Sequence, residues 1–300
     1  MTMNRALFAL ALPLLGGIGT YASPLVPRQT ITTLATAQIS SFKPFTFFAA
    51  AGYCNPSTTL AWNCGANCQA NADFIPVASG GDGGSVQFWF VGFSPSQKTV
   101  IVSHQGTDPS EIESLVTDSE FFLESLDATL FPGVSSSIKA HNGFADEQAK
   151  TATTILSAVQ SAMSAHGTES VTIVGHSLGA AISLIDSIYL PIHLPSGTTF
   201  RTILYALPRV GNPAFADYVD AHASVTHINN KEDIVPILPG RFLGYAQPNG
   251  EIHIQDSGAW DVCPGHDNTD SRCTTGDVSN IFDGDLGDHD GPYDGVEMSC

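Results

Sequence analysis

The chain lacks several features that would place it in large classes of proteins. Among its 300 residues, basic side chains are scarce, with 11 Lys and Arg against 29 Asp and Glu, which gives a net charge of −18. A surface of this charge repels phosphate, so nucleic acids and anionic membrane surfaces are expected to be poor partners. The chain also has no internal repeat, no Pro- or Ser-rich linker and no asparagine glycosylation motif. Because 43% of the residues are apolar and only 13% are charged, one folded domain with a large core is expected.

Long apolar runs are missing as well, except close to the N-terminus. Residues 6–19 (ALFALALPLLGGIG) form an apolar segment behind Arg5 that is too short and too rich in glycine to span a bilayer comfortably. The small residues that end at Ala22 fit a signal-peptidase site, so residues 1–22 are expected to be a secretory signal peptide. A second cleavage after Arg28 is an alternative. The expected product is a secreted, extracellular protein of residues 23–300 without stable membrane anchoring.

Cysteine is sparse but even in number, which is informative for an exported chain. An even count in an oxidising compartment predicts three disulfides, although the spacing alone leaves all fifteen connectivities open. The alternative of a zinc site at the closely spaced Cys64 and Cys68 is disfavoured by the export signal. The six cysteines are Cys54, Cys64, Cys68, Cys263, Cys273 and Cys300.

Strand-like and helix-like segments alternate along the chain. Residues 85–93 and 99–104 are rich in aromatic and β-branched residues and predict strands. Residues 143–166 carry apolar side chains at helical spacing and end at Gly167, a plausible helix stop. This alternation predicts an α/β protein with a central, mostly parallel sheet flanked by helices.

The segment VGHSLGA contains a serine between two glycines in the pattern G-x-S-x-G. Gly175 and Gly179 permit a sharp turn from a strand into a helix, and Ser177 at that turn projects its Oγ above the sheet. The N–H of Leu178 then lies at the N-terminus of the helix, where it is placed to stabilise an oxyanion. The pattern predicts that Ser177 is a nucleophile and that His176 packs beneath the turn.

A serine nucleophile needs a histidine base and a carboxylate that orients the base. On this type of turn the acid and the base follow the serine in the chain. Asp233 stands just beyond a predicted strand, and its neighbour Glu232 is the alternative acid. Asp186 lies on the helix after the serine and is expected to face away from the turn.

Three late histidines compete for the role of base. His253 alternates with apolar residues on a predicted strand, and His266 lies between two cysteines. His289 lies in a glycine- and aspartate-rich stretch, FDGDLGDHDGPYDG, that is typical of a loop. The residues themselves do not decide which of these three histidines is the base. The same stretch does not fit a calcium-binding EF-hand, because Gly287 stands where a ligand is needed and Asp288 where glycine is needed.

Six segments carry a resemblance to a known family: VIVSHQGT, AHNGFADEQ, VTIVGHSLGAA, YALPRVGNPAFADYV, THINNKEDIVPILP and DHDGPYDG. They resemble segments of the fungal class 3 lipases, a family of secreted lipases and feruloyl esterases, over residues 48–300. The resemblance implies an α/β-hydrolase fold with a short helical lid. It implies that Asp233 is the acid, that His289 is the base, and that Thr107 joins Leu178 as an oxyanion donor. One departure is Gln105, where the family often has arginine.

The resemblance also implies disulfide pairing and a lid. The implied pairs are Cys54 with Cys300, Cys64 with Cys68, and Cys263 with Cys273. The segment DPSEIESLV would form the lid, and its Ile112, Leu115 and Val116 fall on one helical face. The alternative is a surface helix whose apolar side faces the core.

The expected function is hydrolysis of carboxylic esters, with triacylglycerols at an oil–water interface as the first substrate class. The alternatives are a feruloyl or cutin-type esterase acting on plant cell walls and a non-catalytic lipid-binding protein on the same scaffold. No cofactor and no metal ion are expected, and a monomer is expected.

Overall fold

The computed structural model describes residues 30–107 and 122–300, so the expected signal peptide and the lid residues Ile112, Leu115 and Val116 lie outside the described residues. The strands are β1 (Thr32–Thr33), β2 (Ile75–Gly80), β3 (Trp89–Ser94), β4 (Thr99–His104), β5 (Leu123–Ser125), β6 (Lys139–His141), β7 (Ser170–His176), β8 (Thr199–Tyr205), β9 (Val225–Asn230), β10 (Glu251–Ile254) and β11 (Trp260–Cys263). The α-helices are α1 (Thr36–Ser40), α2 (Lys43–Ala51), α3 (Pro56–Leu60), α4 (Ala66–Ala70), α6 (Asn142–His166), α7 (Leu178–His193), α8 (Pro213–His222) and α9 (Thr274–Asp277), and the 3₁₀ helices are η1 (Val235–Ile237), η2 (Arg241–Leu243) and η3 (Leu286–Asp288).

One sheet of nine strands organises the fold, in the order β1-β11-β10-β9-β8-β7-β4-β3-β2. The five central strands, β10, β9, β8, β7 and β4, are parallel to their neighbours in this group. Two antiparallel strands extend the sheet on each side. The predicted α/β architecture with a mostly parallel sheet is therefore confirmed. Parallel strands end at the same edge, so the segments that follow β4, β7 and β9 meet there.

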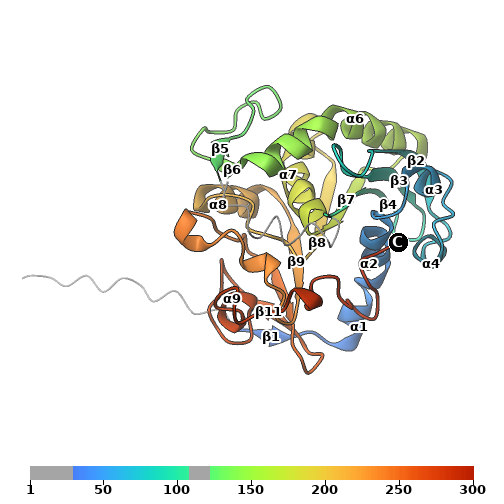
Figure 1. The fold of residues 1–300 in the computed structure, drawn as a ribbon. Coiled ribbons are helices and arrows are strands. Elements are labelled where there is room, and N and C mark those ends of the chain that lie inside the picture. Colours follow the sequence, from blue (N-terminus) through green and yellow to red (C-terminus); the bar gives the residue numbers. More distant parts are fainter. Residues whose placement is uncertain (1–29, 108–121) are drawn as a thin grey trace, which may run out of the picture.

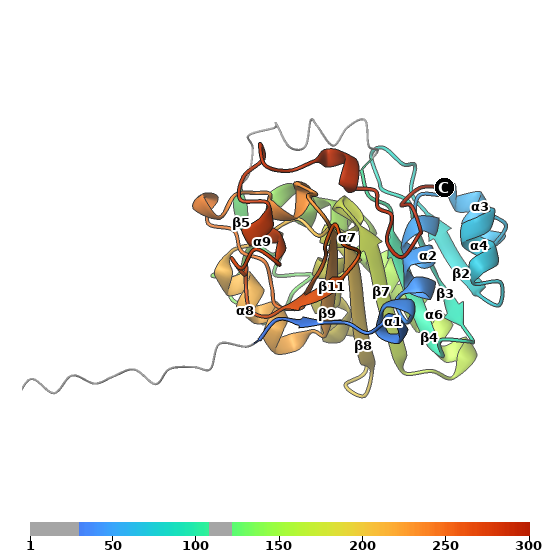
Figure 2. The ribbon, with the colours of Figure 1, turned by 90° about the horizontal axis from the view of Figure 1, so that it is seen from below.

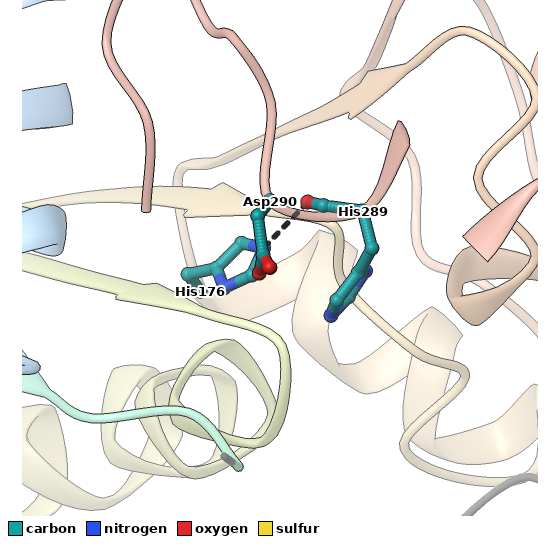
Figure 3. Close-up of side chains that lie close together, drawn as sticks. All are labelled: His176, His289 and Asp290. Atoms are coloured by element: carbon teal, nitrogen blue, oxygen red, sulfur yellow. Dashed lines mark hydrogen bonds between the residues drawn. The ribbon is translucent and has the colours of Figure 1, made fainter. Parts of the chain in front are cut away.

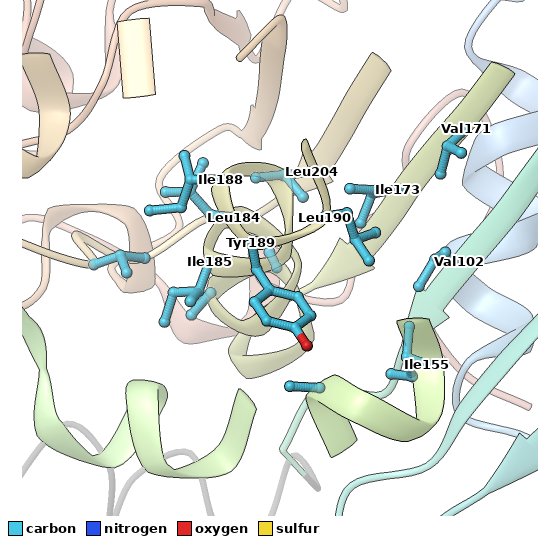
Figure 4. Close-up of a cluster of buried hydrophobic side chains, with 14 of the residues drawn as sticks. Val102, Ile155, Val171, Ile173, Leu184, Ile185, Ile188, Tyr189, Leu190 and Leu204 are labelled. Carbon is cyan, nitrogen blue, oxygen red and sulfur yellow. The ribbon is translucent and has the colours of Figure 1, made fainter. Parts of the chain in front are cut away.

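Both faces of the central sheet are covered, as a parallel sheet requires. On β4, Val100 and Val102 belong to a cluster with α6 and α7, whereas Ile101 belongs to a second cluster with α2. This alternation follows from the two-residue period of a strand. Figure 4 shows the first cluster, in which side chains of α7 meet those of β7 and α6.

Helix α6 begins and ends close to the predicted positions. Its first turn is capped by the His141 ring, and the chain leaves it through Gly167 at φ 60°, a left-handed conformation that suits glycine. The first predicted strand is correct in kind but not in extent, because β3 covers Trp89–Ser94 rather than residues 85–93. In the preceding residues, Asp82 accepts hydrogen bonds from the backbone N–H groups of Gly84 and Val86 and closes a turn instead.

Three disulfides staple the fold: Cys54–Cys300, Cys64–Cys68 and Cys263–Cys273. These are the pairs that the resemblance implies. The first joins residues 246 positions apart and fixes the C-terminus beside α2, as both Figure 1 and Figure 2 show. Among the described residues, no helix combines the length and the apolar character needed to cross a bilayer.

Candidate active site

Ser177 occupies a sharp turn between β7 and α7. It caps the helix at φ 58° and ψ −127°, a strained conformation for a residue with a side chain. The turn requires close approach, since a Cβ atom on Gly179 would lie 2.4 Å from the carbonyl oxygen of His104. The serine is buried, and its Oγ has no hydrogen-bond partner among the described residues. The local geometry is that of a nucleophile elbow.

Asp233 and His289 meet at the same edge of the sheet. Asp233 follows β9, and its Oδ2 lies 2.8 Å from Nδ1 of His289, which ends η3. The other carboxylate oxygen accepts a hydrogen bond of 2.9 Å from the N–H of Val235. Both side chains are buried. Because a carboxylate only accepts hydrogen bonds, Nδ1 carries the proton and Nε2 keeps its lone pair.

The competing residues are engaged elsewhere. Glu232 is exposed. His253 places Nε2 2.8 Å from the carbonyl oxygen of Lys231, and His266 places Nε2 2.7 Å from Oδ2 of Asp220. The structure therefore brings Asp233 together with His289 and with neither of the other two histidines.

The hydroxyl of Ser177 and the ring of His289 do not form a hydrogen bond in this structure. Ser177 Oγ and His289 Nε2 are both buried atoms without a partner in the described parts of the chain. The ring of His176, the residue before Ser177, lies 4.5 Å from the ring of His289. Such hydrogen bonds are often long in unliganded enzymes and tighten when substrate binds.

The segment after β4 lies directly against Ser177. A Cβ atom on Gly106 would lie 3.0 Å from the Cβ of Ser177 and 2.7 Å from the carbonyl oxygen of His176, so this approach requires glycine. The next residue, Thr107, is buried, and its hydroxyl has no partner among the described residues. Leu178 is the first residue of α7, so its N–H is at the positive end of that helix.

Gln105 holds this segment to Phe88, the residue before β3. Its N–H donates to the carbonyl oxygen of Phe88 over 2.8 Å, and its side-chain Oε1 accepts from the N–H of Phe88 over 2.9 Å. These two hydrogen bonds fix the backbone that precedes Gly106. Gln105 thus attaches the segment that leads to Thr107 without the arginine that the resemblance led us to expect.

His176 supports the loop that carries His289. Its Nε2 lies 2.9 Å from the carbonyl oxygen of His289 (Figure 3). Its Nδ1 lies 2.6 Å from the Tyr53 hydroxyl. The carbonyl can only accept, so Nε2 is the protonated nitrogen and Nδ1 accepts from the tyrosine. Burial, together with the nearby His289, holds the pKa of His176 well below its usual value. The ring is therefore a neutral support, consistent with the packing role predicted for it.

A metal site at this place is not favoured by these contacts. Possible ligand atoms of His176, His289 and Asp290 lie within 4.8 Å of one another, and Figure 3 shows the Asp290 carboxylate beside the His176 ring. A neutral imidazole offers one lone pair to a metal, and the lone pair of His176 already accepts from Tyr53. The Nδ1 of His289 is engaged with Asp233.

The loop that carries His289 has further anchors that sequence reasoning missed. Lys231 Nζ lies 3.1 Å from Oδ1 of Asp288, and the side-chain amide of Asn230 donates to the carbonyl oxygen of Asp288 over 2.9 Å. The N–H of Asp285 donates to the carbonyl oxygen of Glu232 over 2.7 Å. The loop that carries Asp233 (the acid loop) thereby holds the loop that carries His289 (the base loop) at two points just before His289. Only the adjacency of Asn230 and Lys231 to Asp233 in the sequence could have suggested this.

The aromatic and aliphatic residues after the lid segment contribute mainly to the core. Leu126 and Phe131 are buried in the cluster that also contains α6 and α7. Phe122, by contrast, is exposed.

Comparison with known proteins places these features in one family. The family described as Lipase (class 3) matches residues 101–243. A secreted mono- and diacylglycerol lipase 3 of Gibberella zeae is 32% identical over 71% of this chain and 68% of its own length. A secreted mono- and diacylglycerol lipase of Malassezia restricta is 30% identical over 67% of this chain, but the match spans only 63% of that relative.

Solved structures agree in fold. Lipase II from Rhizopus niveus is 27% identical, with a TM-score of 0.76 over 90% of this chain and 99% of that chain. The triacylglyceride lipase of Rhizomucor miehei is 26% identical, with a TM-score of 0.76 over 90% of this chain and 98% of that one. These neighbours have the α/β-hydrolase fold that was predicted. On this combination of sequence match and fold, the chain belongs to the class 3 lipase family.

Proposed function

We propose that this chain is a secreted carboxylic ester hydrolase acting on acylglycerols, with Ser177, Asp233 and His289 as its catalytic triad. The observation that carries the proposal is the buried hydrogen bond of 2.8 Å between Asp233 and His289, at the sheet edge where Ser177 forms its strained turn. Membership of the lipase family supports the same reaction class. The proposal includes export after loss of residues 1–22 and one α/β-hydrolase domain of residues 23–300.

The reaction would proceed through an acyl-enzyme. Ser177 Oγ attacks the ester carbonyl carbon while its proton passes to Nε2 of His289. The bond to the alcohol breaks, and the alcohol leaves with that proton. Water then attacks the acyl-enzyme, gives a proton to Nε2, and releases the fatty acid and the serine hydroxyl. Throughout, Asp233 holds Nδ1–H and stabilises the imidazolium that forms.

The negative charge that develops on the carbonyl oxygen needs donors that are already in place. We assign this role to Thr107, through its N–H and hydroxyl, and to the N–H of Leu178. The close approach of Gly106 to Ser177 supports the assignment. A buried hydroxyl without a partner at Thr107 also fits, because it would gain its acceptor when the oxyanion forms.

The substrate class rests on the comparisons and not on the site. Solved neighbours are named triacylglycerol lipases, which supports triacylglycerols as the first candidate. Sequence relatives are named mono- and diacylglycerol lipases, which supports partial glycerides as the second.

The deciding experiment measures fatty acid release from emulsified trioctanoylglycerol, dioctanoylglycerol and monooctanoylglycerol, with methyl ferulate in parallel. A triacylglycerol lipase releases acid from all three glycerides, whereas a partial-glyceride lipase leaves the first intact. Hydrolysis of methyl ferulate alone would move the chain to the cell-wall esterases.

Two variants identify the nucleophile in the same assay. Ser177→Ala should abolish release and labelling by a fluorophosphonate. Ser161→Ala, on the exposed side of α6, is the matched control and should retain both. Full activity in Ser177→Ala would end the proposal, and a folded parent that neither hydrolyses nor labels would favour a non-catalytic lipid-binding protein.

A further inference from the structure

A cavity of about 480 Å³ lies between the segment that follows the acid and the segment that precedes the base. One wall comes from η1, η2 and the turn between them, and the other from residues 275–281 just after α9 begins. The volume falls in the range of small-molecule sites, roughly 300–1,000 Å³. The lining residues used below are Ile237, Leu243, Val278, Ile281, Arg241 and Phe242.

Some residues that line this cavity, and the neighbouring Phe282, are large apolar residues with exposed side chains. Phe242 is 90% exposed, and Phe282, next to the lining residue Ile281, is 91% exposed. Leu243 and Ile281 are exposed as well. Large apolar side chains gathered around a cavity are typical of a surface that binds an apolar ligand.

The cavity also carries a positive charge in a strongly acidic chain. Arg241 is exposed on η2, and no carboxylate of the described residues forms an ion pair with it. Arg209, deeper in the wall, differs because it pairs with Asp267 over 2.7 Å and donates to two backbone carbonyls. The positive charge of Arg241 contributes to a lowered pKa of Arg209, after the larger effect of burial and against the opposing effect of Asp267. Both arginines line the same cavity.

Among the described residues, Asp283 forms no ion pair with Arg241. Asp283, on the base loop beyond the cavity, accepts hydrogen bonds from the Ser279 hydroxyl and the Asn280 amide within its own turn. At a net charge of −18, an anion that is not bound specifically is repelled by the rest of the surface. Arg241 thus forms a local exception that suits one carboxylate group.

We propose that this cavity binds one single-chain fatty acid, with the alkyl chain between the two apolar walls and the carboxylate at Arg241. The inference rests on the proposed function, because ester hydrolysis releases this class of molecule close by. Charge selects the ligand, since Arg241 is unfavourable for a cationic amphiphile and gives no ion pair to a neutral glyceride.

A ligand in this cavity would contact the two segments that position the catalytic acid and base. Ile237 lies in η1, directly after the acid, and Val278 packs with Ile234 and Ile237 in a small separate cluster. The same cluster contacts Leu286 in η3, directly before His289. A bound chain therefore rests against both segments that hold the triad, and retained product would slow turnover.

Calorimetric titration of the folded Ser177→Ala protein with dodecanoate, below its micelle concentration, tests the proposal directly. One molecule should bind per chain, and dodecyltrimethylammonium should bind at least tenfold more weakly. Arg241→Gln should weaken dodecanoate binding about tenfold and Arg241→Lys less, while Phe242→Ser should weaken binding of both amphiphiles. Arg272→Gln, which removes an exposed arginine paired with Asp270, is the matched control and should change nothing.

The outcomes separate this inference from the proposed function. Equal binding to the parent and Arg241→Gln, or equal binding of both amphiphiles, would overturn the cavity as a fatty acid site. Hydrolysis of p-nitrophenyl butyrate by the wild-type chain is measured alongside. If the ester is hydrolysed but dodecanoate does not bind, only the inference fails; if dodecanoate binds in an Arg241-dependent way without hydrolysis, only the proposed function fails.

Discussion

His104 and Asp186 form a buried pair behind the nucleophile, with Nε2 of the histidine 2.8 Å from Oδ2 of the aspartate. His104 ends β4 and leads into the oxyanion segment, whereas Asp186 lies in α7, the helix that Ser177 caps. The second carboxylate oxygen accepts from the side-chain amide of Gln148 in α6 over 2.8 Å. One carboxylate thus links the strand before Thr107 to two helices.

Removing this carboxylate should be costly, because it leaves two buried polar groups without partners. We expect Asp186→Ala to lower the free energy of unfolding by about 3–5 kcal/mol, the usual cost of breaking a buried pair from one side. Urea unfolding at pH 7 measures the change. Asp217→Ala, on an exposed position of α8, is the control and should change stability little. An Asp186→Ala protein as stable as its parent would show that the pair contributes nothing.

The orientation of His289 should depend on Asp233. Asp233→Asn offers an amide that can donate to Nδ1 and so favours the wrong tautomer, with the proton on Nε2. We expect kcat for a soluble ester to fall by about 10⁴-fold while the protein stays folded. The matched control is Glu232→Gln, one residue earlier and exposed, which should keep normal kinetics. Equal loss in both variants would place the effect on the loop and not on the carboxylate.

The Thr107 hydroxyl should act on the transition state and not on substrate binding. Thr107→Val keeps the shape but removes the donor, so we expect kcat to fall by roughly 10²-fold with KM nearly unchanged. Thr107→Ser should restore most of the rate, because it returns a hydroxyl to the same place. Steady-state kinetics on p-nitrophenyl butyrate measure both. A rise in KM with constant kcat would instead indicate a substrate-binding role.

Local patterns predicted the parts of the site that depend on backbone geometry. The glycines around Ser177 are needed for a sharp turn wherever the turn occurs, and Asp233 follows a strand whose end is fixed by the parallel sheet. The choice among His253, His266 and His289 was not available from the residues alone. It depends on which loop folds back over the turn, and the acid loop decides this through its contacts with Asp285 and Asp288.

Contacts between distant residues could not be predicted in the same way. Tyr53 and His176 are 123 positions apart, and His104 and Asp186 are 82 apart. Its place on the helix after the serine indicated that Asp186 faces away from the turn. It did not indicate that Asp186 would be buried and paired with a histidine of β4. A polar residue in an apolar helix stays inside only when a partner satisfies it, and the sequence does not name the partner.

The Cys54–Cys300 disulfide should stabilise the chain more than the Cys64–Cys68 disulfide. It joins residues separated by 246 positions, against four for the shorter one, and the unfolded chain loses more freedom when a longer loop is closed. We expect replacement of Cys54 and Cys300 by serine to cost about 2–5 kcal/mol. Urea unfolding under oxidising conditions compares the free energy of unfolding of this double variant with that of the variant in which Cys64 and Cys68 are replaced by serine. Equal losses would argue that local strain and not loop length sets the effect.

Stability should fall in mild acid, because buried histidines must remain neutral in the folded state. Burial lowers the pKa of His227 to about 4, below the value of about 6.5 expected for the unfolded chain. Between these values the unfolded state binds a proton that the folded state does not, so this contribution is complete above pH 6.5 and is lost as the pH falls towards 4. In His227→Gln, the amide can replace the Nε2 donor to the Pro248 carbonyl, but it does not titrate. We expect the free energy of unfolding of this variant to fall less steeply between pH 6.5 and pH 4, by about 1.4 kcal/mol per pH unit. Urea unfolding from pH 8 to pH 4.5 measures both proteins, which should run parallel above pH 7. Parallel curves throughout the acid range would show that His227 does not carry the effect.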